Sequence, residues 1–341
     1  MWYIALMTQL GTVACACLTP GQRGKVLAAF SQAIYLLTEA GELFWLAADG
    51  APMHRRCAQI SAQLPGLSAG SPFHVEDQRL VIDPGFIFDV NQALPWSAPR
   101  LDPNRVLAIT ELPARMDAFF SRLDLAQAKG FGEFISPILS LAQNESNSPT
   151  SAFTDPVLRF AQPFVLDMAR ACLDRQPSRI SKNADALVGL GAGLTPSGDD
   201  FLGGWLFAVK NLQAAYPNLN LIDHSISVDT YHSRTHVISF TLLKDLAGGQ
   251  AIAPLHHIIN NLLSGEPREN IHPHVSQLTH IGHSTGWDLA AGLLTGMFIA
   301  YRSGDFTSAC QAERSTTSQK PDNPTAAIPA RWNPLIRSTP G

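Results

Sequence analysis

The pattern of apolar and polar positions changes about a third of the way along the chain. In the first hundred residues, short apolar runs alternate with turn residues, as at 79–82 and 86–88 around Asp83-Pro84-Gly85. Proline presets φ in such a turn and glycine accepts a positive φ, so this arrangement is typical of a hairpin. Residues 25–38 are similarly rich in apolar side chains. We therefore expect a small antiparallel β sheet or barrel over residues 20–97.

From about residue 102 the apolar positions recur at helical spacing instead. They predict three amphipathic helices with apolar faces at 157–172, 201–212 and 290–301. Pro156 suits the first turn of the first of these helices. Shorter helices are expected at 235–247 and 255–263, and a polar surface loop at 144–149.

The expected fold class is therefore α+β. An N-terminal antiparallel β domain at residues 1–100 is followed by a mainly α-helical domain at 101–310 that carries glycine-rich ligand loops. Residues 311–341 hold five of the 24 prolines and little apolar periodicity. This composition predicts an irregular, Pro-rich tail.

Composition and charge then narrow the function classes. Hydrophobic residues make up 45% of the chain and charged residues 15%, which is typical of a globular protein. The 24 basic and 28 acidic residues nearly cancel, and no basic stripe points to a nucleic-acid partner. No apolar stretch reaches the length of about 18 residues that a membrane helix needs. The five cysteines form no CxxC pair, which favours a reducing, cytoplasmic location.

The most informative stretch for chemistry is the glycine-rich segment 189–203, GLGAGLTPSGDDFLG. Glycines at alternate positions let the backbone turn tightly and let a ligand approach bare N–H groups. A glycine-rich entry into a helix N-terminus favours anions. We therefore expect ligand donors at Gly191, Gly193, Thr195, Ser197 and Gly198. The alternative is a capped helix after a glycine loop, in which Thr195 or Ser197 caps the helix and Asp200 completes a capping box.

A second segment repeats this chemistry 88 positions later. Residues 197–204 (SGDDFLGG) align with residues 285–292 (TGWDLAAG), and Gly286 and Asp288 occupy the positions of Gly198 and Asp200. Two matching entrances suggest that both helix N-termini face one pocket across a pseudo-two-fold axis. Coincidence is the alternative, because a hydroxyl residue followed by Gly-x-Asp is a common way to begin a helix.

Two other patterns carry weaker signals. Residues 282–286 (GHSTG) match the nucleophile elbow of serine hydrolases, but no buried strand is predicted before them. Six histidines lie between residues 256 and 283, and His280 and His283 could share a helical face, but no acidic ligand or HExxH frame accompanies them. No metal site is therefore expected, and Ser284 is better explained as a cap or ligand donor. Thr235 and Ser239 place two hydroxyls on one face at the start of a helix.

These motifs together resemble a bacterial family that includes the small (AllH-type) subunit of the three-subunit oxamate carbamoyltransferase of anaerobic allantoin breakdown. The resemblance is carried by GLGxGLTPSGDDFLxG at 189–204, by residues 235–239 and by residues 281–288, and it spans roughly residues 20–305. Ala192 stands where the family usually has proline. The Pro-rich tail after residue 310 and the histidines at 256, 257, 272 and 274 are also outside the family pattern.

The resemblance implies conversion of oxalurate and phosphate to oxamate and carbamoyl phosphate, beside a larger subunit similar to acyl-CoA synthetases. The expected ligand is a small carboxylate or phosphate, and Mg²⁺ would enter only with the phosphate. We expect Asp199 or Asp200 to orient a substrate amide or a Mg²⁺-bound phosphate, and His283 to transfer a proton. Thr235, Ser239, Ser284, Gly286 and Asp288 complete the expected ligand site. The alternative is a non-catalytic ligand-binding or assembly subunit.

Overall fold

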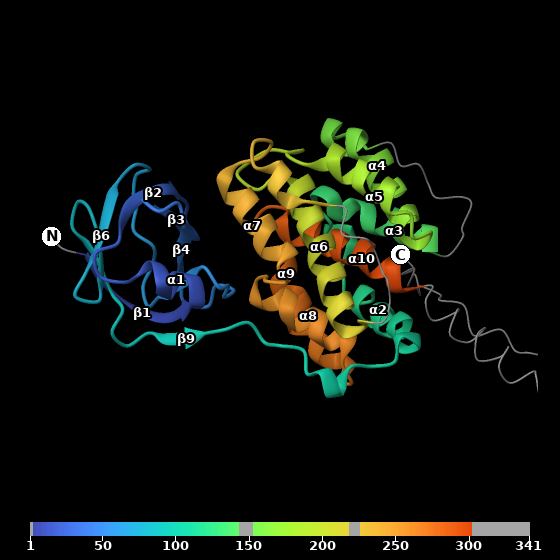
Figure 1. The fold of residues 1–341 in the computed structure, drawn as a ribbon, viewed down its shortest axis with the longest axis horizontal. Helices are drawn as coiled ribbons and strands as arrows, with labels where there is room; N and C mark the ends of the chain where they lie inside the picture. Colours follow the sequence, from blue (N-terminus) through green and yellow to red (C-terminus); the bar gives the residue numbers. More distant parts are fainter. Residues whose placement is uncertain (1–2, 143–152, 218–225, 302–341) are drawn as a thin grey trace, which may run out of the picture. The chain divides into compact units, whose positions relative to one another are not determined.

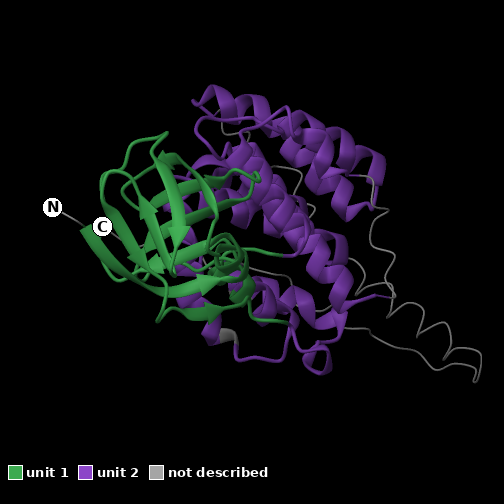
Figure 2. Ribbon diagram, turned by 60° about the vertical axis from the view of Figure 1, so that its left-hand side comes forward, with its two compact units in different colours: residues 1–100, 250–257 green, residues 101–249, 258–341 purple. Residues whose placement is uncertain are grey.

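The structure is a computed structural model that describes residues 3–142, 153–217 and 226–301. The chain divides into two compact units (Figure 2). Unit 1 comprises residues 1–100 and 250–257, and unit 2 comprises residues 101–249 and 258–341. The first unit is built of strands and the second of helices (Figure 1), which confirms the expected α+β class. The predicted loop at 144–149 and the predicted tail at 311–341 lie outside the described residues.

Unit 1 is a closed β barrel. Its strands are β1 (Tyr3–Gly11), β2 (Arg23–Ala29), β3 (Ala33–Thr38), β4 (Leu43–Ala48), β5 (Cys57–Ile60), β6 (Pro72–Glu76), β7 (Arg79–Ile82), β8 (Phe86–Asp89) and β9 (Leu94–Trp96). They follow the order β5-β4-β3-β2-β6-β7-β8-β1-β9, and an additional β5–β1 pairing closes the barrel. Alternate residues of the strands point inward, and the core includes Met7, Ile34, Leu36, Phe44 and Phe88.

The strand pairing differs from the antiparallel expectation in three places. β1 pairs in parallel with β8 and β9, and β4 pairs in parallel with β5. The expected sheet began at residue 20, but β1 precedes it and is followed by the short helix α1 (Thr12–Cys17). The apolar stretch 25–38 lies in a hairpin of β2 and β3. The predicted turn between β7 and β8 is confirmed, with Gly85 at φ 93°.

The described part of unit 2 is built of helical elements. Its main elements are α2 (Leu112–Phe120), η4 (Gly130–Phe134), α3 (Ile135–Ala142), α4 (Pro156–Leu173), α5 (Pro177–Leu187), α6 (Ser197–Ala215), η5 (Val228–Tyr231), α7 (Val237–Ala247), α9 (His272–Thr279) and α10 (Thr285–Tyr301). The helices predicted at 157–172, 201–212, 235–247 and 290–301 correspond to α4, α6, α7 and α10. The helix α8 (Ala253–Leu263) runs across the division between the units, and η6 (Arg268–Ile271) precedes α9. No helix in the described part of the chain combines the length and the apolar character that crossing a membrane requires.

Helices α6 and α10 form the centre of unit 2 (Figure 1). The sequence predicts α10 as an amphipathic helix with one apolar face, but every residue from Gly286 to Ala300 is buried. Small residues such as Ala290, Gly292 and Gly296 make this possible, because they let neighbouring helices approach on the side where a polar face would be expected. The central position of α10 therefore depends on its glycines and alanines as much as on its large apolar side chains.

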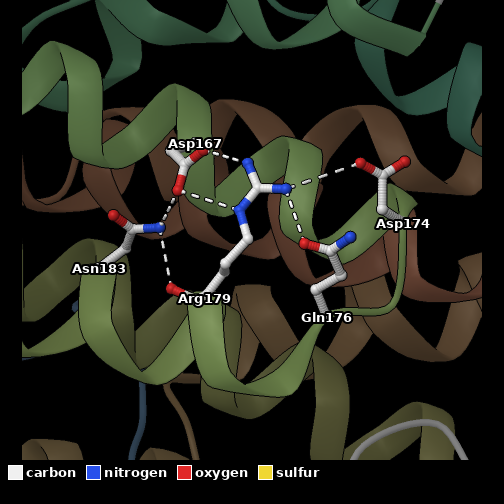
Figure 3. A network of polar contacts seen from close by, with 5 residues as sticks. All are labelled: Asp167, Asp174, Gln176, Arg179 and Asn183. Atoms are coloured by element: carbon white, nitrogen blue, oxygen red, sulfur yellow. Dashed lines mark hydrogen bonds and ion pairs between the residues drawn. The ribbon is translucent and has the colours of Figure 1, made fainter.

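A network of polar contacts fixes α5 against α4 (Figure 3). The Asp167 carboxylate on α4 accepts hydrogen bonds from the Arg179 guanidinium and from Asn183 Nδ2, the latter at 2.7 Å. Arg179 also donates to Gln176 Oε1 at 2.8 Å and lies 3.9 Å from a carboxylate oxygen of Asp174. Because α5 ends at Leu187, this network positions the residues that lead into the glycine-rich loop.

Candidate functional site

The two helix starts singled out by the sequence lie side by side. Ser197 Oγ of α6 is 3.4 Å from Ser284 Oγ, which directly precedes α10. Thr195 Oγ1 is likewise 3.4 Å from Thr285 Oγ1 at the start of α10. The predicted juxtaposition of the two S/T-G-x-D segments is therefore confirmed, and four hydroxyl groups gather where the helices begin.

Equivalent glycines permit both helix starts to approach the chain before them. A Cβ atom on Gly198 would lie 2.0 Å from the carbonyl oxygen of Leu187, and one on Gly286 would lie 1.7 Å from that of Leu278. The Gly198 N–H donates to Leu190 O at 2.9 Å, and the Gly286 N–H donates to Ile281 O at 3.1 Å. Only glycine fits such contacts, which explains why both motifs carry it at this position.

Further along the same helices, two more glycines make a reciprocal contact. A Cβ on Gly204 of α6 would lie 2.2 Å from the Leu289 carbonyl oxygen, and one on Gly292 of α10 would lie 1.9 Å from the Phe201 carbonyl oxygen. Gly204 and Gly292 are the last residues of the two aligned segments. Each glycine thus contacts the carbonyl group of the residue that follows the aspartate in the other helix. A local two-fold relation between the helices requires this reciprocal pattern.

The two helices bring together two carboxyl groups that are incompletely satisfied. Asp200 is 5% exposed and Asp288 is 0% exposed. Within the described part of the chain, Oδ2 of each residue is buried without a hydrogen-bond partner. Oδ1 of Asp288 accepts a hydrogen bond from the Phe131 N–H at 2.6 Å. Buried polar atoms are normally paired, so these two oxygens mark a place where a bound group would complete the hydrogen bonding.

Burial also raises the pKa values of these two carboxyl groups. It raises the pKa of Asp200 well above its ordinary value, and the nearby Asp288 charge adds to the rise, while the hydroxyls of Thr285 and Thr195 oppose it. Burial raises the pKa of Asp288 to about 7, against the opposing hydrogen bonds of Ser284, Phe131 and Ser197. Both pKa shifts favour the protonated form of these carboxyl groups.

Asp199, the neighbour of Asp200, has a different environment. Its Oδ1 accepts a hydrogen bond from the Gly189 N–H at 2.7 Å. Its Oδ2 accepts hydrogen bonds from Ser239 Oγ at 2.6 Å and from Thr235 Oγ1. Thr235 and Ser239, which the sequence suggested as ligand donors, thus bind this carboxylate, and Asp199 ties the glycine-rich loop to the start of α7.

The glycine-rich loop has the expected left-handed turns. Gly189, Gly191 and Gly193 have φ values of 73°, 124° and 93°. Gly191 lies against Ser197, whose backbone nitrogen would be 2.8 Å from a Cβ. Ala192 and Gly193 are exposed, and no described residue accepts a hydrogen bond from their N–H groups. The loop therefore presents free donors beside the hydroxyl cluster.

The expected capping of α6 is wrong in detail. Pro196 is the N-cap residue, and no side chain caps this helix. The Asp199 and Asp200 N–H groups donate to Pro196 O, and at α10 the Trp287 and Asp288 N–H groups donate in the same way to Ser284 O. The hydroxyls and carboxyls that would cap an isolated helix instead face the neighbouring helix start.

Of the other predicted residues, His283 is exposed on the turn before Ser284. The GHSTG motif follows α9 and not a strand, so the context of a nucleophile elbow is missing. Among the described residues there is no cluster of three His, Cys, Asp or Glu side chains that could hold a metal ion. His256 is buried in unit 1, where its Nε2 accepts a hydrogen bond from the Ala251 N–H.

The contact between η4 and Asp288 was not predicted from the sequence. The Phe131 N–H binds Asp288, and a Cβ on Gly130 would lie 2.5 Å from Asp288 Oδ1. Gly130 has φ 56°, and Gly132 packs against the Trp287 side chain. The pair of glycines around Phe131 was a signal of close approach, but nothing in the sequence linked it to an aspartate 157 positions away.

The segment that contains both helix starts is similar to a known protein family. Residues 187–297 match the family model described as oxamate carbamoyltransferase subunit AllH. The AllH match confirms the resemblance, over a shorter range than the expected 20–305. It covers about a third of the chain and includes both helix starts, Asp199, Asp200 and Asp288. Comparisons with curated proteins and with solved structures give no match.

Proposed function

We propose that this chain is a carbamoyltransferase-type subunit that binds a small carbamoyl compound where α6 and α10 begin. One observation carries the proposal: the AllH-matching segment joins two buried, unpartnered carboxyl oxygens and four hydroxyls at paired helix N-termini. A carbamoyl group ends in a planar NH₂ with two N–H donors, and a carboxylate oxygen is the natural acceptor for such a donor.

The two ends of the substrate are then held by different groups. The carbamoyl NH₂ lies against Asp200 and Asp288, and its carbonyl oxygen accepts from the Ser197, Ser284, Thr195 or Thr285 hydroxyls. The carboxylate end of the substrate would be repelled by an ionised aspartate, so it is held by the free N–H groups of the loop at Ala192 and Gly193. The attacking phosphate lies between this loop and the carboxyl pair, within reach of the carbamoyl carbon.

The reaction proposed is the one that the family description implies, conversion of oxalurate and phosphate to oxamate and carbamoyl phosphate in purine breakdown. A small anionic substrate and a larger, acyl-CoA-synthetase-like subunit are the proposed partners. Mg²⁺ is proposed only as a companion of the phosphate, because Mg²⁺ usually keeps waters and substrate oxygens as ligands. The four described cysteines are free thiols, which supports a reducing, cytoplasmic location.

Ligand binding by purified protein tests this proposal. Oxalurate, oxamate, carbamoyl phosphate and inorganic phosphate are titrated calorimetrically into the wild type and into Asp200→Asn and Asp288→Asn, with and without Mg²⁺. We expect oxalurate and carbamoyl phosphate to bind the wild type, and the variants to bind at least tenfold more weakly. Asp229→Asn, which alters an exposed ion pair with Lys244, is the control and should bind as the wild type does. Equal affinity in all four proteins would refute the proposed site.

The alternative is a ligand-binding or assembly subunit without turnover of its own. It needs a test because the matching family is one subunit of oxamate carbamoyltransferase. Transfer is therefore assayed with the chain alone and with the proposed larger subunit added. Binding without turnover in both assays would favour the alternative. Turnover by the chain alone would exclude it.

A further inference from the structure

We propose that Asp200 and Asp288 act as a dyad that shares one proton and moves the single proton that the carbamoyl transfer displaces. The inference rests on the proposed function for its substrate, but the sharing of the proton is a property of the folded chain alone. It gives the carboxyl pair a chemical role beyond holding the carbamoyl group.

The geometry that carries this inference is the two-fold relation of α6 and α10. It places the aspartates at equivalent positions, each with one buried oxygen that has no partner in the described part of the chain. Burial disfavours a charge on each of these two carboxyl groups, and a shared proton removes one of the charges. Asp288 Oδ1 is held by the Phe131 N–H, so its Oδ2 is the atom left to exchange a proton.

The proposed transfer needs one proton to move. An oxygen of HPO₄²⁻ attacks the carbamoyl carbon of oxalurate, the new O–C bond forms, and the C–N bond to the oxamate nitrogen breaks. Phosphate loses its proton, and the departing nitrogen gains one. A dyad with one proton performs both steps, because one carboxyl donates to the nitrogen while the carboxylate accepts from phosphate. The dyad ends with the proton count it began with, so no other acid, base or oxidant is required.

Neighbouring titratable groups are less suited to this role. They are Asp199 on α6, Lys129 and Glu133 at η4, Arg234 and His236 before α7, and His283 before α10. Asp199 has both oxygens engaged by Gly189, Ser239 and Thr235. His283, which the sequence suggested for proton transfer, is exposed, and Lys129 and Glu133 are not the residues of η4 that contact Asp288.

Infrared spectroscopy tests the shared proton without any substrate. The full chain is compared with Asp200→Asn, Asp288→Asn and the control Asp229→Asn at neutral pH. We expect a protonated-carboxyl C=O band in the wild type and the control, and a shift of its frequency in both dyad variants, because the remaining buried carboxyl then has an amide and not a carboxylate as its proton-sharing neighbour. A band that keeps its frequency in both variants, or is missing from the wild type, would overturn the shared proton.

Two carbamoyl donors test the proton transfer. Departure of the oxamate nitrogen requires a proton, whereas 4-nitrophenyl carbamate loses a phenolate that needs none. We expect each dyad variant to lose about 10²–10⁴-fold in kcat with oxalurate and much less with 4-nitrophenyl carbamate. Equal losses with both donors would show a binding role only and would overturn the dyad. If the wild type transfers from neither donor, the proposed function fails, and the transfer role with it, while the infrared result still decides whether the proton is shared.

Discussion

Asp200 and Asp288 occupy equivalent positions on α6 and α10. The rise that burial causes in the pKa of each aspartate is opposed by the hydroxyl group of the first residue of the other helix. Thr285 of α10 lies near Asp200, and Ser197 of α6 lies near Asp288. This crossed arrangement exists because Gly204 and Gly292 let the two helices approach to backbone contact. The candidate site is thus a direct product of how two central helices pack.

Removing one charge of the pair should stabilise the fold. We expect Asp200→Asn to raise Tm at pH 7 by a few degrees, the change that about 1 kcal/mol produces in a large domain. The physical reason is that burial, with the charges of Asp288 and Asp199 adding to it, raises the pKa of Asp200, so folding at pH 7 requires either uptake of a proton or burial of a charge, and Asn requires neither. Thermal melts of the variant and the wild type check this. A lower Tm for the variant would show that the carboxyl serves the fold.

Asp199→Asn should have the opposite effect. Both oxygens of Asp199 accept hydrogen bonds, and an amide would turn a donor toward the Gly189 N–H or the Ser239 hydroxyl. We expect a loss of about 1–3 kcal/mol in the free energy of unfolding, typical of hydrogen bonds to a charged group. Denaturant unfolding measures this loss. A variant as stable as the wild type would contradict it, and Ser239→Ala, which removes one donor, should lose less.

The pH dependence of stability should carry the signature of Asp288. Because its pKa is raised from 3.8 to about 7 in the folded protein, the folded state holds a proton that the unfolded chain has released. Its stabilising contribution is therefore complete below about pH 4 and is lost as pH rises toward 7. We expect the free energy of unfolding of the wild type, taken relative to that of Asp288→Asn, to fall as pH rises across this window. A difference that stays constant with pH would contradict the raised pKa.

The helix contact should be intolerant of a methyl group. Alanine normally favours a helix over glycine by up to about 1 kcal/mol, but Gly204→Ala and Gly292→Ala would each place a Cβ within 2.2 Å of a backbone oxygen. We expect both variants to unfold at distinctly lower temperature, with loss of ligand binding. Gly66→Ala, where a Cβ would meet no atom within 4 Å, is the control. If Gly204→Ala is as stable as the wild type, α6 and α10 do not make the backbone contact described here.

The network on α4 and α5 makes a smaller, acid-sensitive contribution. Hydrogen bonding from Arg179 lowers the pKa of Asp167, so the stabilisation is present above pH 3.8 and is lost as pH falls below that value. Asp167 and Arg179 are more than a third exposed, and solvent screening limits the effect of Asp167→Asn to about 1 kcal/mol or less. Urea unfolding at pH 7 and pH 3 measures it. An undiminished difference at pH 3 would assign the effect to packing.

The sequence by itself determined the main helices of unit 2 and the segments that form the candidate site. Apolar periodicity placed α4, α6 and α10 within a few residues of their observed bounds, because a helix buries a regular set of positions. The repeated S/T-G-x-D segments indicated paired helix starts, since glycine at a fixed position reports close approach. The glycine-rich motif also identified the segment that matches AllH.

Only the tertiary structure decided which of these residues act together. It separated Asp199, whose oxygens are engaged by Gly189, Thr235 and Ser239, from Asp200, which faces Asp288. It also brought Phe131 to Asp288 and made a closed barrel by pairing β1 with β5 and β8. Such contacts join residues far apart in the chain, and local propensity does not encode them. The raised pKa values of Asp200 and Asp288 are likewise a consequence of burial, which exists only once α6 and α10 have packed.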